Sequence, residues 1–363
     1  MSSRNWLIFV TLLILVFLLR LRLASWPHFI SGTRVKITAT LTEEPKIVGQ
    51  TQRFSLMGIN IRTWRYPQFH YGQRLEVVGT IKKGNTIEVV EEIKILSETN
   101  DVRGEILALR RKVEGVYRRV LPEPQSSLLA GIVLGSKSGL PNDVYQNLQK
   151  TGTLHMVVAS GMNVTIVGST LLSFFLLFTS RHLALIFAFL GIWFYVLLAG
   201  AEIPVIRAGM MGTLAFLAAG LGREADGWRG LGLAAAVLLL IDPLSLFDLG
   251  FQLSFTATAG ILFFGRKISN LLIWVPRQLR PDLAQTLGAQ IATLPLILIN
   301  FGQYSLFSLP ANLLVVTSLS LIMKLGAIVA ILGLTLAPLS QVVAWFLWPL
   351  LTYCVKVVEL FGG

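Results

Sequence analysis

An apolar run between residues 154 and 178 contains four residues where lipid-facing leucines would cost less. They are His155, Ser160, Gly161 and Asn163. A polar side chain in hydrocarbon costs several kcal/mol unless it finds a partner. On one ideal helix, the three polar side chains fall within an arc of about 140°. The pattern predicts that one face of this segment lines a polar pathway.

Polar residues also interrupt the apolar runs that follow. Arg207 lies about one turn inside a predicted span, and Asp242 precedes a span that carries Gln252 and Ser254. Asn312 lies in a later span. Such residues mark ligand or ion pathways in membrane proteins, but they also hold helices together, and an arginine near a span's end can reach the interface. For each single residue, the sequence does not decide among these three roles.

The composition excludes an ordinary soluble domain, because 54% of the 363 residues are hydrophobic and 14% are charged. Much of the charge lies within residues 31–120, whereas residues 126–363 form apolar runs of roughly 16–24 residues, as membrane helices do. The net charge of +12 fits either an anionic partner or the setting of membrane topology by Lys and Arg.

Neither a metal site nor a nucleotide site can be recognised in the residue types. The single cysteine, Cys354, excludes a disulfide framework and a cysteine zinc site. The histidines are scattered at positions 28, 70, 155 and 182, and no Gly-x4-Gly-Lys-Ser/Thr loop is present. We therefore expect no cofactor, and any pulling force on a substrate would come from partners or from the proton gradient.

The N-terminal third predicts two parts. Residues 1–30 contain the apolar run Trp6–Leu23, which lacks a convincing cleavage site and reads as an uncleaved membrane anchor. Residues 31–100 contain short alternating segments rich in Val, Ile and Thr, separated by glycine turns. Four or five such strands fit a small all-β barrel of the OB type.

The rest of the chain reads as helical. Residues 101–122 predict an amphipathic basic helix, which commonly lies along an anionic membrane surface. Residues 123–363 predict the transmembrane domain, with candidate spans at 126–136, 154–178, 183–200, 204–221, 228–241, 250–265, 284–300, 307–323, 325–337 and 342–358. The predicted fold is a polytopic α-helical membrane protein with about 8–10 membrane segments.

Loop charges predict the orientation. The loops around Arg181, Arg223–Arg229 and Arg266–Arg280 are basic, and they alternate with acidic or uncharged loops. By the positive-inside rule the basic loops face the cytoplasm, which places the β barrel outside.

Cations and aromatic residues alternate in one stretch of the barrel. Arg62, Trp64, Arg65 and Tyr66 combine a basic groove with stacking platforms, as proteins that bind single-stranded nucleic acid do. The alternative is that aromatic rings of this region fill the barrel, which we expect for Phe54 and Tyr71.

The ordered motifs resemble one family. They are His-x4-Ser-Gly from 155, Pro-x-x-Arg-Ala from 204, Asp-Pro…Gly-Phe-Gln-Leu-Ser-Phe from 242, and Phe-Gly-Gln-x-Ser…Ala-Asn-Leu from 301. Their order over residues 125–320 is similar to the competence domain of ComEC proteins, the inner-membrane channels for DNA uptake in natural transformation. The anchor and the OB-like segment match that family's usual arrangement.

The resemblance implies passage of one DNA strand across the bacterial inner membrane while the other strand is degraded. It nominates His155, Ser160, Gly161, Pro204, Arg207, Asp242, Gly250, Gln252, Ser254 and Asn312, and we add Asn163 to the pathway. It also implies a lipid bilayer, a separate DNA receptor, a nuclease and a cytoplasmic helicase as partners, with a homo-oligomer as an option.

Two departures from the family's pattern bear on chemistry. Asn163 stands where the family often has a second histidine, which argues against a two-histidine metal or proton device. The scattered histidines cannot build the metal site of the nuclease domain of larger relatives, so either the chain is a fragment or the nuclease is separate or absent. We expect no enzyme activity. Hydrolysis by His155 and Ser160 is disfavoured, because no Gly-x-Ser-x-Gly elbow accompanies them.

Two alternative functions remain open from the sequence. The first is a secondary transporter of an anionic small molecule or lipid, built on broken spans and a lone arginine. The second is a membrane-anchored interaction module, for which so many polar spans are excessive.

Overall fold

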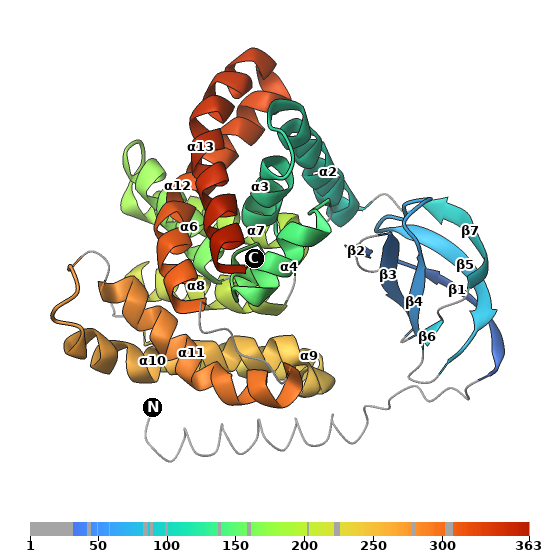
Figure 1. Ribbon diagram of the computed structural model, residues 1–363, viewed down its shortest axis with the longest axis horizontal. Coiled ribbons are helices and arrows are strands. Elements are labelled where there is room, and N and C mark those ends of the chain that lie inside the picture. The colour runs from blue at the N-terminus through green and yellow to red at the C-terminus, as the bar shows by residue number, and fades with distance from the viewer. Residues whose placement is uncertain are drawn as a thin grey trace. The chain divides into compact units, whose positions relative to one another are not determined.

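The computed structural model describes residues 32–362 except for 42–44, 49, 58, 83–85, 88–89, 99–100, 137–138, 158–160, 202, 221–225, 278–279 and 302–307. The predicted N-terminal anchor lies outside the described residues. The described chain is mostly helical, with a small β region that precedes the helices, as expected (Figure 1).

The chain divides into two compact units. Among the described residues, the first unit contains 161–196 and 203–317, and the second contains 32–157, 197–201 and 318–362.

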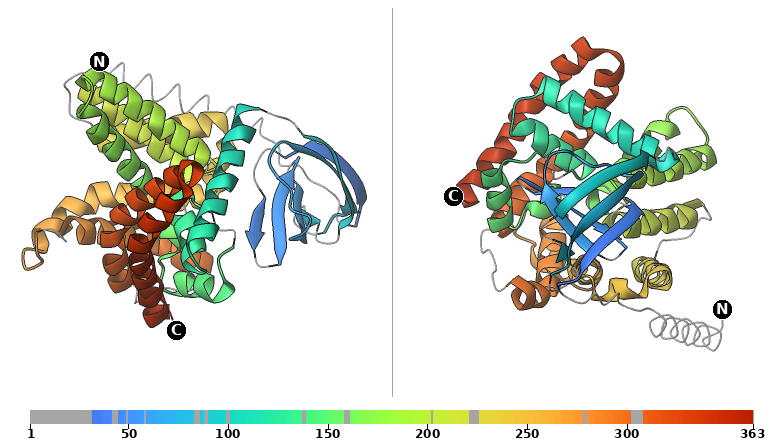
Figure 2. Two further views of the ribbon diagram at one scale, coloured as in Figure 1. Left: turned by 90° about the horizontal axis from the view of Figure 1, so that it is seen from above. Right: turned by 90° about the vertical axis from the view of Figure 1, so that its right-hand side faces the viewer.

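The β region belongs to the second unit and consists of two small sheets. Its strands are β1 (Arg34–Thr40), β2 (Lys46–Val48), β3 (Thr51–Leu56), β4 (Ile59–Trp64), β5 (Gln73–Thr80), β6 (Thr86–Ile87) and β7 (Val90–Glu98). One sheet has the order β1-β5-β7 and the other β2-β3-β4-β6, in which only the β4–β6 pair is parallel. Figure 2 shows the strands from two further directions.

Alternation along the strands explains the core of the β region. In β3 and β5 every second side chain is buried, and β4 follows the same alternation as far as Ile61, as expected for strands with one face on a core. Phe54 and Ile61 lie directly opposite each other in the β3–β4 pair and belong to one cluster with Leu75 and Val77. Phe69 packs edge-on against Phe54, with ring centroids 5.8 Å apart.

The helices of the second unit are α2 (Val102–Val120), α3 (Gln125–Leu134), α4 (Asn142–Lys150), α5 (Leu154–Val157), α13 (Ala337–Gly362) and part of α12 (Ser308–Thr335). The apolar side of α2 packs inside this unit. The Tyr117 hydroxyl donates to the carbonyl of Gly326 in α12 at 3.0 Å, and the Gln341 amide of α13 donates to the carbonyl of Val120. Because protein covers that side, a membrane-surface position of α2 would rest on its basic side alone.

The β region is joined to the start of α2 by a small polar network. The Asp101 carboxylate accepts hydrogen bonds from the backbone N–H of Gly104 and from the Tyr71 hydroxyl, both at 2.8 Å. The Arg103 guanidinium lies 4.8 Å from the centre of the Tyr71 ring. The hydrogen bond from Tyr71 holds the pKa of the Asp101 carboxyl below its ordinary value of 3.8, and the same bond raises the pKa of Tyr71.

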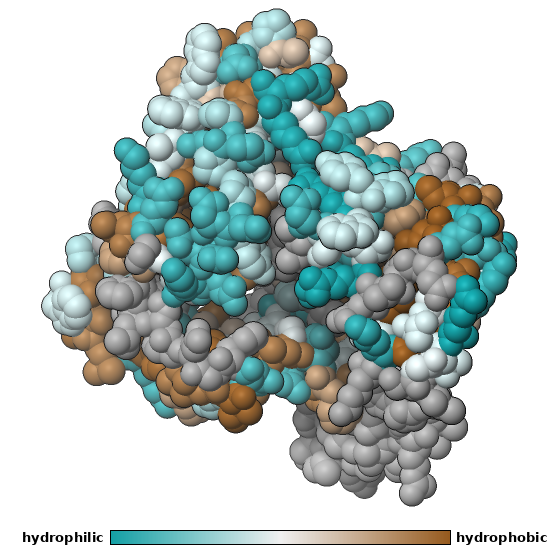
Figure 3. Space-filling view, turned by 45° about the vertical axis from the view of Figure 1, so that its right-hand side comes forward, coloured by the Kyte–Doolittle hydropathy of each residue, from teal (hydrophilic) through white to brown (hydrophobic). Residues whose placement is uncertain are grey.

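The remaining helices are α6 (Gly161–Leu176), α7 (Arg181–Leu198), α8 (Ile203–Gly220), α9 (Gly227–Ile241), α10 (Leu249–Leu271) and α11 (Arg280–Phe301), with the 3-10 turn η1 (Pro243–Phe247). Within the described ranges, four helices are long and apolar enough to cross a membrane: Arg181–Leu198, Arg280–Asn300, Pro310–Thr335 and Ala337–Gly362. Figure 3 shows apolar side chains at the surface beside polar ones, and large apolar side chains such as Phe187 and Trp345 are exposed.

One predicted boundary between spans differs in the structure. The predicted spans 307–323 and 325–337 meet inside a single helix, α12, which runs from Ser308 to Thr335. Lys324, at the predicted boundary, is exposed on α12, where its long side chain does not interrupt the backbone hydrogen bonds. The predicted span 154–178 contains α5 and α6, and residues 158–160 between them lie outside the described part.

Glycines let the membrane-type helices approach closely. Helices α10 and α11 touch through their backbones, since a Cβ at Gly260 would lie 2.4 Å from the carbonyl oxygen of Gly288 and 2.5 Å from the Cβ of Ala292. A Cβ at Gly168 of α6 would lie 2.8 Å from Ile192 of α7. Small residues at helix contacts are typical of membrane proteins, where close packing drives association.

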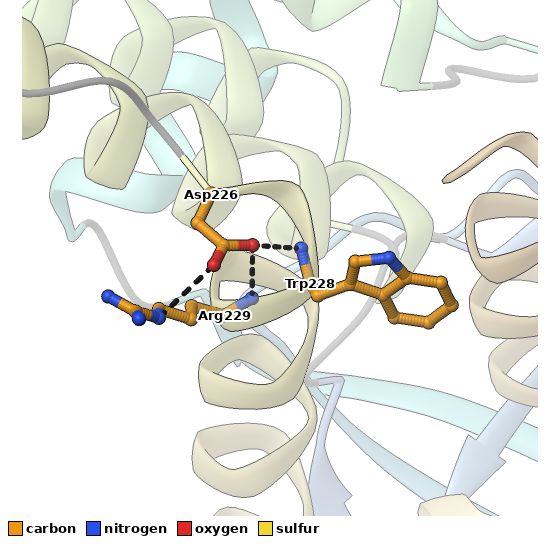
Figure 4. A network of polar contacts seen from close by, with 3 residues as sticks. All are labelled: Asp226, Trp228 and Arg229. Atoms are coloured by element: carbon orange, nitrogen blue, oxygen red, sulfur yellow. Dashed lines mark hydrogen bonds and ion pairs between the residues drawn. The ribbon is translucent and has the colours of Figure 1, made fainter. Parts of the chain in front are cut away.

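The start of α9 is capped by a charged network (Figure 4). The Asp226 carboxylate accepts from the backbone N–H groups of Trp228 and Arg229 at 3.0 and 3.3 Å, and it pairs with the Arg229 side chain at 3.1 Å. The Trp228 side chain is exposed. Tryptophan and arginine at a helix end are typical of a membrane–water interface.

The glycine contact generates a stability prediction. We expect Gly260→Ala to lower the free energy of unfolding by about 1–3 kcal/mol, because the added methyl overlaps α11. Gly265→Ala, on the same helix, is the matched control, since its Cβ would meet only Ile261 of its own helix at 4.0 Å. It should gain up to about 1 kcal/mol of helix propensity. Thermal unfolding of both proteins in detergent measures the difference, and equal midpoints would contradict the contact.

The Asp101 network generates a pH prediction. Because the folded state lowers the pKa of Asp101, its contribution to stability is present above the ordinary value of 3.8 and is lost as the pH falls through the lowered folded value. Denaturant unfolding of the wild type and of Asp101→Asn between pH 3 and pH 7 tests this. We expect the difference in stability to shrink toward the acid end, and a constant difference would rule the linkage out.

Candidate functional site

Arg207 is buried in the helical part of the first unit. It lies in α8, whose first turn contains Pro204, a position where proline fits because the first helical N–H groups have no partner within the helix. Only 7% of Arg207 is exposed. A buried guanidinium requires hydrogen bonds and compensating charge or aromatic contact, so its surroundings define a polar site.

Helix α10 supplies the contacts of Arg207. The Nη1 group donates a hydrogen bond to the hydroxyl of Thr258, which in turn donates to the backbone carbonyl of Ser254 at 3.0 Å. The guanidinium carbon lies 5.6 Å from the centre of the Phe255 ring, a cation–π distance. Phe255 is stacked on Phe251, with centroids 4.2 Å apart.

One edge of the guanidinium remains without a partner among the described residues. The Nε atom is buried and makes no hydrogen bond, and no carboxylate of the described chain forms an ion pair with Arg207. Gly161 of α6 lies beside the guanidinium. A Cβ built on Gly161 would lie 3.6 Å from the Nη2 atom of Arg207 and 3.6 Å from the Cβ of Ala208.

Asp242 and Gln252 have structural partners in the connection between α9 and α10. Asp242 caps η1 by accepting from the backbone N–H of Leu244 at 3.1 Å and from the hydroxyl of Ser245 at 2.8 Å. The Gln252 amide donates to the carbonyl of Leu246 at 3.0 Å. Asp248 caps α10 by accepting from the backbone N–H of Phe251. These contacts orient the start of α10, and the pathway role of both residues stays a prediction.

The other predicted pathway residues are placed as follows. Asn163 is fully buried in α6, and Asn312 is buried in α12 with a side-chain oxygen that makes no hydrogen bond within the described structure. His155 belongs to α5 of the second unit, whereas Asn163 belongs to the first. Ser160 and the side chain of His155 lie outside the described part. The arc expected on one continuous helix stays a prediction, because residues 158–160 between α5 and α6 lie outside the described part.

Sequence reasoning missed the α10 partners of Arg207. Phe251, Phe255 and Thr258 are spaced i, i+4 and i+7, so they share one helix face. That spacing was a usable signal, but it does not say which distant residue the face meets.

The β region provides a second candidate site. Trp64 and Tyr66 are 74% and 68% exposed, and Arg62 is exposed at the end of the same strand. Arg65 is half-buried, with its guanidinium 5.6 Å from the centre of the Tyr66 ring. The two rings are therefore available as stacking platforms beside cations. Of the rings expected in the core, Phe54 is buried there, but Tyr71 is not. It is half-buried because its hydroxyl bonds to Asp101.

A buried glutamine holds the segment that carries these rings. The Gln52 amide nitrogen donates to the carbonyls of Trp64 and Pro67 at 2.8 and 2.6 Å, and its oxygen accepts from the backbone N–H of Phe69 at 3.3 Å. Gln52 is fully buried, although its position in a strand alone does not reveal this role. Three hydrogen bonds from one side chain fix the backbone around Tyr66.

The exposed cations of the β region differ in how they are paired. On β1-β5-β7, Lys36 pairs with Glu76 at 2.9 Å, and Lys94 pairs with Glu92 at 2.7 Å. On β3–β4, Arg53 and Arg62 are exposed and lie directly opposite each other, and neither has an ion-pair partner among the described residues. Like charges in opposed positions are unfavourable, so this face suits an anionic ligand.

We found no candidate metal centre in the described ranges. They contain no group of three or more His, Cys, Asp or Glu side chains that could hold a metal ion.

Comparison with known proteins gives consistent matches. The competence protein family matches residues 132–363. ComE operon protein 3 of Bacillus subtilis (strain 168) is 30% identical over 254 residues, which make up 68% of this chain and 32% of that protein. Competence protein ComA of Neisseria gonorrhoeae is 30% identical over 145 residues, 38% of this chain and 21% of that protein.

A further relative is the uncharacterized protein YcaI of Escherichia coli (strain K12), which is 26% identical over 209 residues, 54% of this chain and 27% of that protein. The matched regions thus span about a third or less of these curated relatives. No solved structure matches the chain. The family match covers more than half of the chain and contains Arg207 with its contacts in α10, so this chain belongs to the competence protein family.

Proposed function

We propose that this protein forms the membrane path by which one strand of DNA enters the cytoplasm during natural transformation. The observation that carries the proposal is Arg207, a buried cation in α8 whose Nε has no partner among the described residues. A polyanion can cross a membrane only where its phosphates meet positive potential. The names of two relatives, competence protein ComA and ComE operon protein 3, support the same process.

The β region is, on this proposal, an OB-type barrel that receives the strand. Its pairing supports this: β1 and β2 together would be the first OB strand, and β6 and β7 the last. The antiparallel β1–β5 and parallel β4–β6 pairs are then the ones that close a five-stranded barrel. The OB face used for oligonucleotides is formed by the second and third strands. Here these are β3 and β4, which carry Arg53, Arg62 and Trp64.

The orientation follows from charge. With the basic loops in the cytoplasm of a bacterial cell, the start of α8 and the β region lie outside the inner membrane. Trp228 and Arg229 at the start of α9 would then mark the cytoplasmic interface. Eight to ten membrane segments are proposed, of which four meet the length and composition of spanning helices in the described chain.

The proposed channel performs no chemistry on DNA itself. A separate receptor, nuclease and cytoplasmic helicase would deliver, process and pull the strand, since the sequence carries no phosphate-binding loop for a nucleotide. The chain could act as a homo-oligomer. The rival, a transporter of an anionic small molecule or lipid, accounts for Arg207 but leaves the exposed rings of Trp64 and Tyr66 without a role.

The first test removes the buried charge. We expect Arg207→Leu to abolish entry of labelled DNA into the cytoplasm while DNA still binds at the cell surface, because the path loses its cation. Arg229→Leu is the matched control, since it removes one positive charge from an exposed position of the first unit. Normal transformation by a stably expressed Arg207→Leu protein would refute the pathway assignment and favour the transporter.

The second test removes the stacking platforms. Trp64→Ala with Tyr66→Ala should weaken binding of a single-stranded oligonucleotide to the purified protein by about 1–3 kcal/mol per stacked base. Ile95→Ala with Leu96→Ala removes exposed apolar side chains from β7 and serves as the control. Fluorescence anisotropy measures both affinities, and an unchanged affinity of the first protein would eliminate the stacking role.

A further inference from the structure

We propose that the α10–α11 loop, residues 272–277, is a lipid-binding element that inserts Ile273 and Trp274 into the bilayer surface and gathers anionic phospholipid headgroups beside them. The proposed headgroup ligands are Arg266, Lys267 and Arg277. The inference needs only a membrane location and does not depend on the proposed passage of DNA. It adds a partner class, anionic lipid, at a site separate from the surroundings of Arg207.

Packing and hydrogen bonds fix the conformation of this loop, which joins the two helices at one end of the pair (Figure 1). Leu272 and Val275 are buried and belong to one cluster with Leu283 of α11. The Nη2 group of Arg280 donates hydrogen bonds to the carbonyls of Ile273 and Val275, at 2.9 and 3.1 Å. Arg280 lies at the end of a helix with the length and composition of a membrane span. The loop is therefore held beside that end, at the depth of the membrane–water interface.

The same conformation directs three large apolar side chains outward. Leu271, Ile273 and Trp274 are 75%, 74% and 80% exposed. Contact of such side chains with water is unfavourable, so a fixed group of them marks an interaction surface. Tryptophan is enriched at the membrane–water interface, because its ring is apolar and its N–H can bond to polar groups. These side chains therefore suit the boundary between headgroups and acyl chains.

Cations flank these apolar side chains in the sequence. Lys267 lies one turn before Leu271 on the same face of α10, with its Nζ 4.3 Å from the centre of the Phe263 ring. Arg266 and Arg277 are exposed, and neither forms an ion pair with a carboxylate of the described chain. Positive side chains next to exposed apolar ones complement a bilayer surface that carries anionic headgroups.

A bilayer accounts for this arrangement better than two alternatives do. The setting of topology by basic loops needs only the charges, and it leaves the fixed outward position of Trp274 without a role. A protein partner would reach the loop from the aqueous phase, whereas Arg280 holds the loop beside the end of a span. No acidic residue occurs between positions 266 and 280, so an anionic bilayer matches both the charge and the apolar surface at that depth.

The first experiment measures the depth of the loop in the purified full-length protein. Trp274→Cys, in a Cys354→Ser background, is labelled with the fluorophore NBD and reconstituted into vesicles of phosphatidylcholine and phosphatidylglycerol at about three to one. We expect lipids with a doxyl group high on the acyl chain to quench the label more strongly than aqueous iodide does. NBD-labelled glutathione in the same suspension gives the value for water. A second label, at Leu271→Cys, keeps Trp274 in place and detects any loss of insertion caused by the first substitution.

The second experiment measures whether anionic lipid gathers at the loop. The Leu271→Cys label is quenched in turn by doxyl-labelled phosphatidylglycerol and by doxyl-labelled phosphatidylcholine at equal mole fraction. We expect phosphatidylglycerol to quench at least about twofold more strongly, and Arg266→Gln with Arg277→Gln to remove the difference, because each cation attracts the anionic headgroup. Lys36→Gln with Lys94→Gln removes the same number of exposed charges from the β region and is the matched control.

The outcomes separate the explanations. Stronger quenching of both labels by iodide than by doxyl lipid would place the loop in water, assign its apolar side chains to a protein partner and overturn the proposal. Equal quenching by the two lipids, or loss of the difference in the control pair as well, would show that the loop selects no anionic headgroup. The substituted loop side chains are exposed, so we expect each variant to fold, which thermal unfolding checks. DNA uptake is scored separately with Arg207→Leu, so either proposal can fail alone.

Discussion

A positive charge buried among apolar helices must be stabilised by the protein, because hydrocarbon offers it no partner, and Arg207 imposes this condition on the first unit. Thr258 and Phe255 of α10 supply the stabilising contacts of Arg207, which requires α8 and α10 to lie in contact. The α6 helix must also come close at Gly161. Close approach is possible because small residues line the helix contacts. A Cβ at Gly209 of α8, for example, would lie 2.9 Å from Val196 of α7.

The polar motif before α10 also contributes to the stabilisation of the buried Arg207. Asp242, Asp248 and Gln252 use their side chains on neighbouring backbone groups, which fixes how the chain enters α10. The position of this entry also determines that Thr258, about two and a half turns into α10, presents its hydroxyl to Arg207. A residue can thus belong to a family motif without touching a substrate, and its replacement would act through the placement of α10.

Local patterns in the sequence predicted the local structure. The alternation of apolar and polar residues identified the strands, and the apolar runs identified the helices, because both signals depend on near neighbours. Tertiary partners were not predictable. Arg207 was nominated by its residue type, but its contact with Thr258 joins two residues that are 51 positions apart in the chain. Gln52 looked like an ordinary strand residue, and Lys324 looked like the end of a span, although a long basic side chain can leave a helix without breaking it.

The uneven pairing of charge in the β region also affects how a charged ligand approaches it. The sheet β1-β5-β7 neutralises Lys36 and Lys94 with nearby acids, whereas Arg53 and Arg62 on β3–β4 remain uncompensated among the described residues. The β3–β4 pair therefore presents two cations side by side and a local positive potential. An approaching polyanion would be attracted to this potential before the surfaces meet, and salt shortens the distance over which the attraction acts.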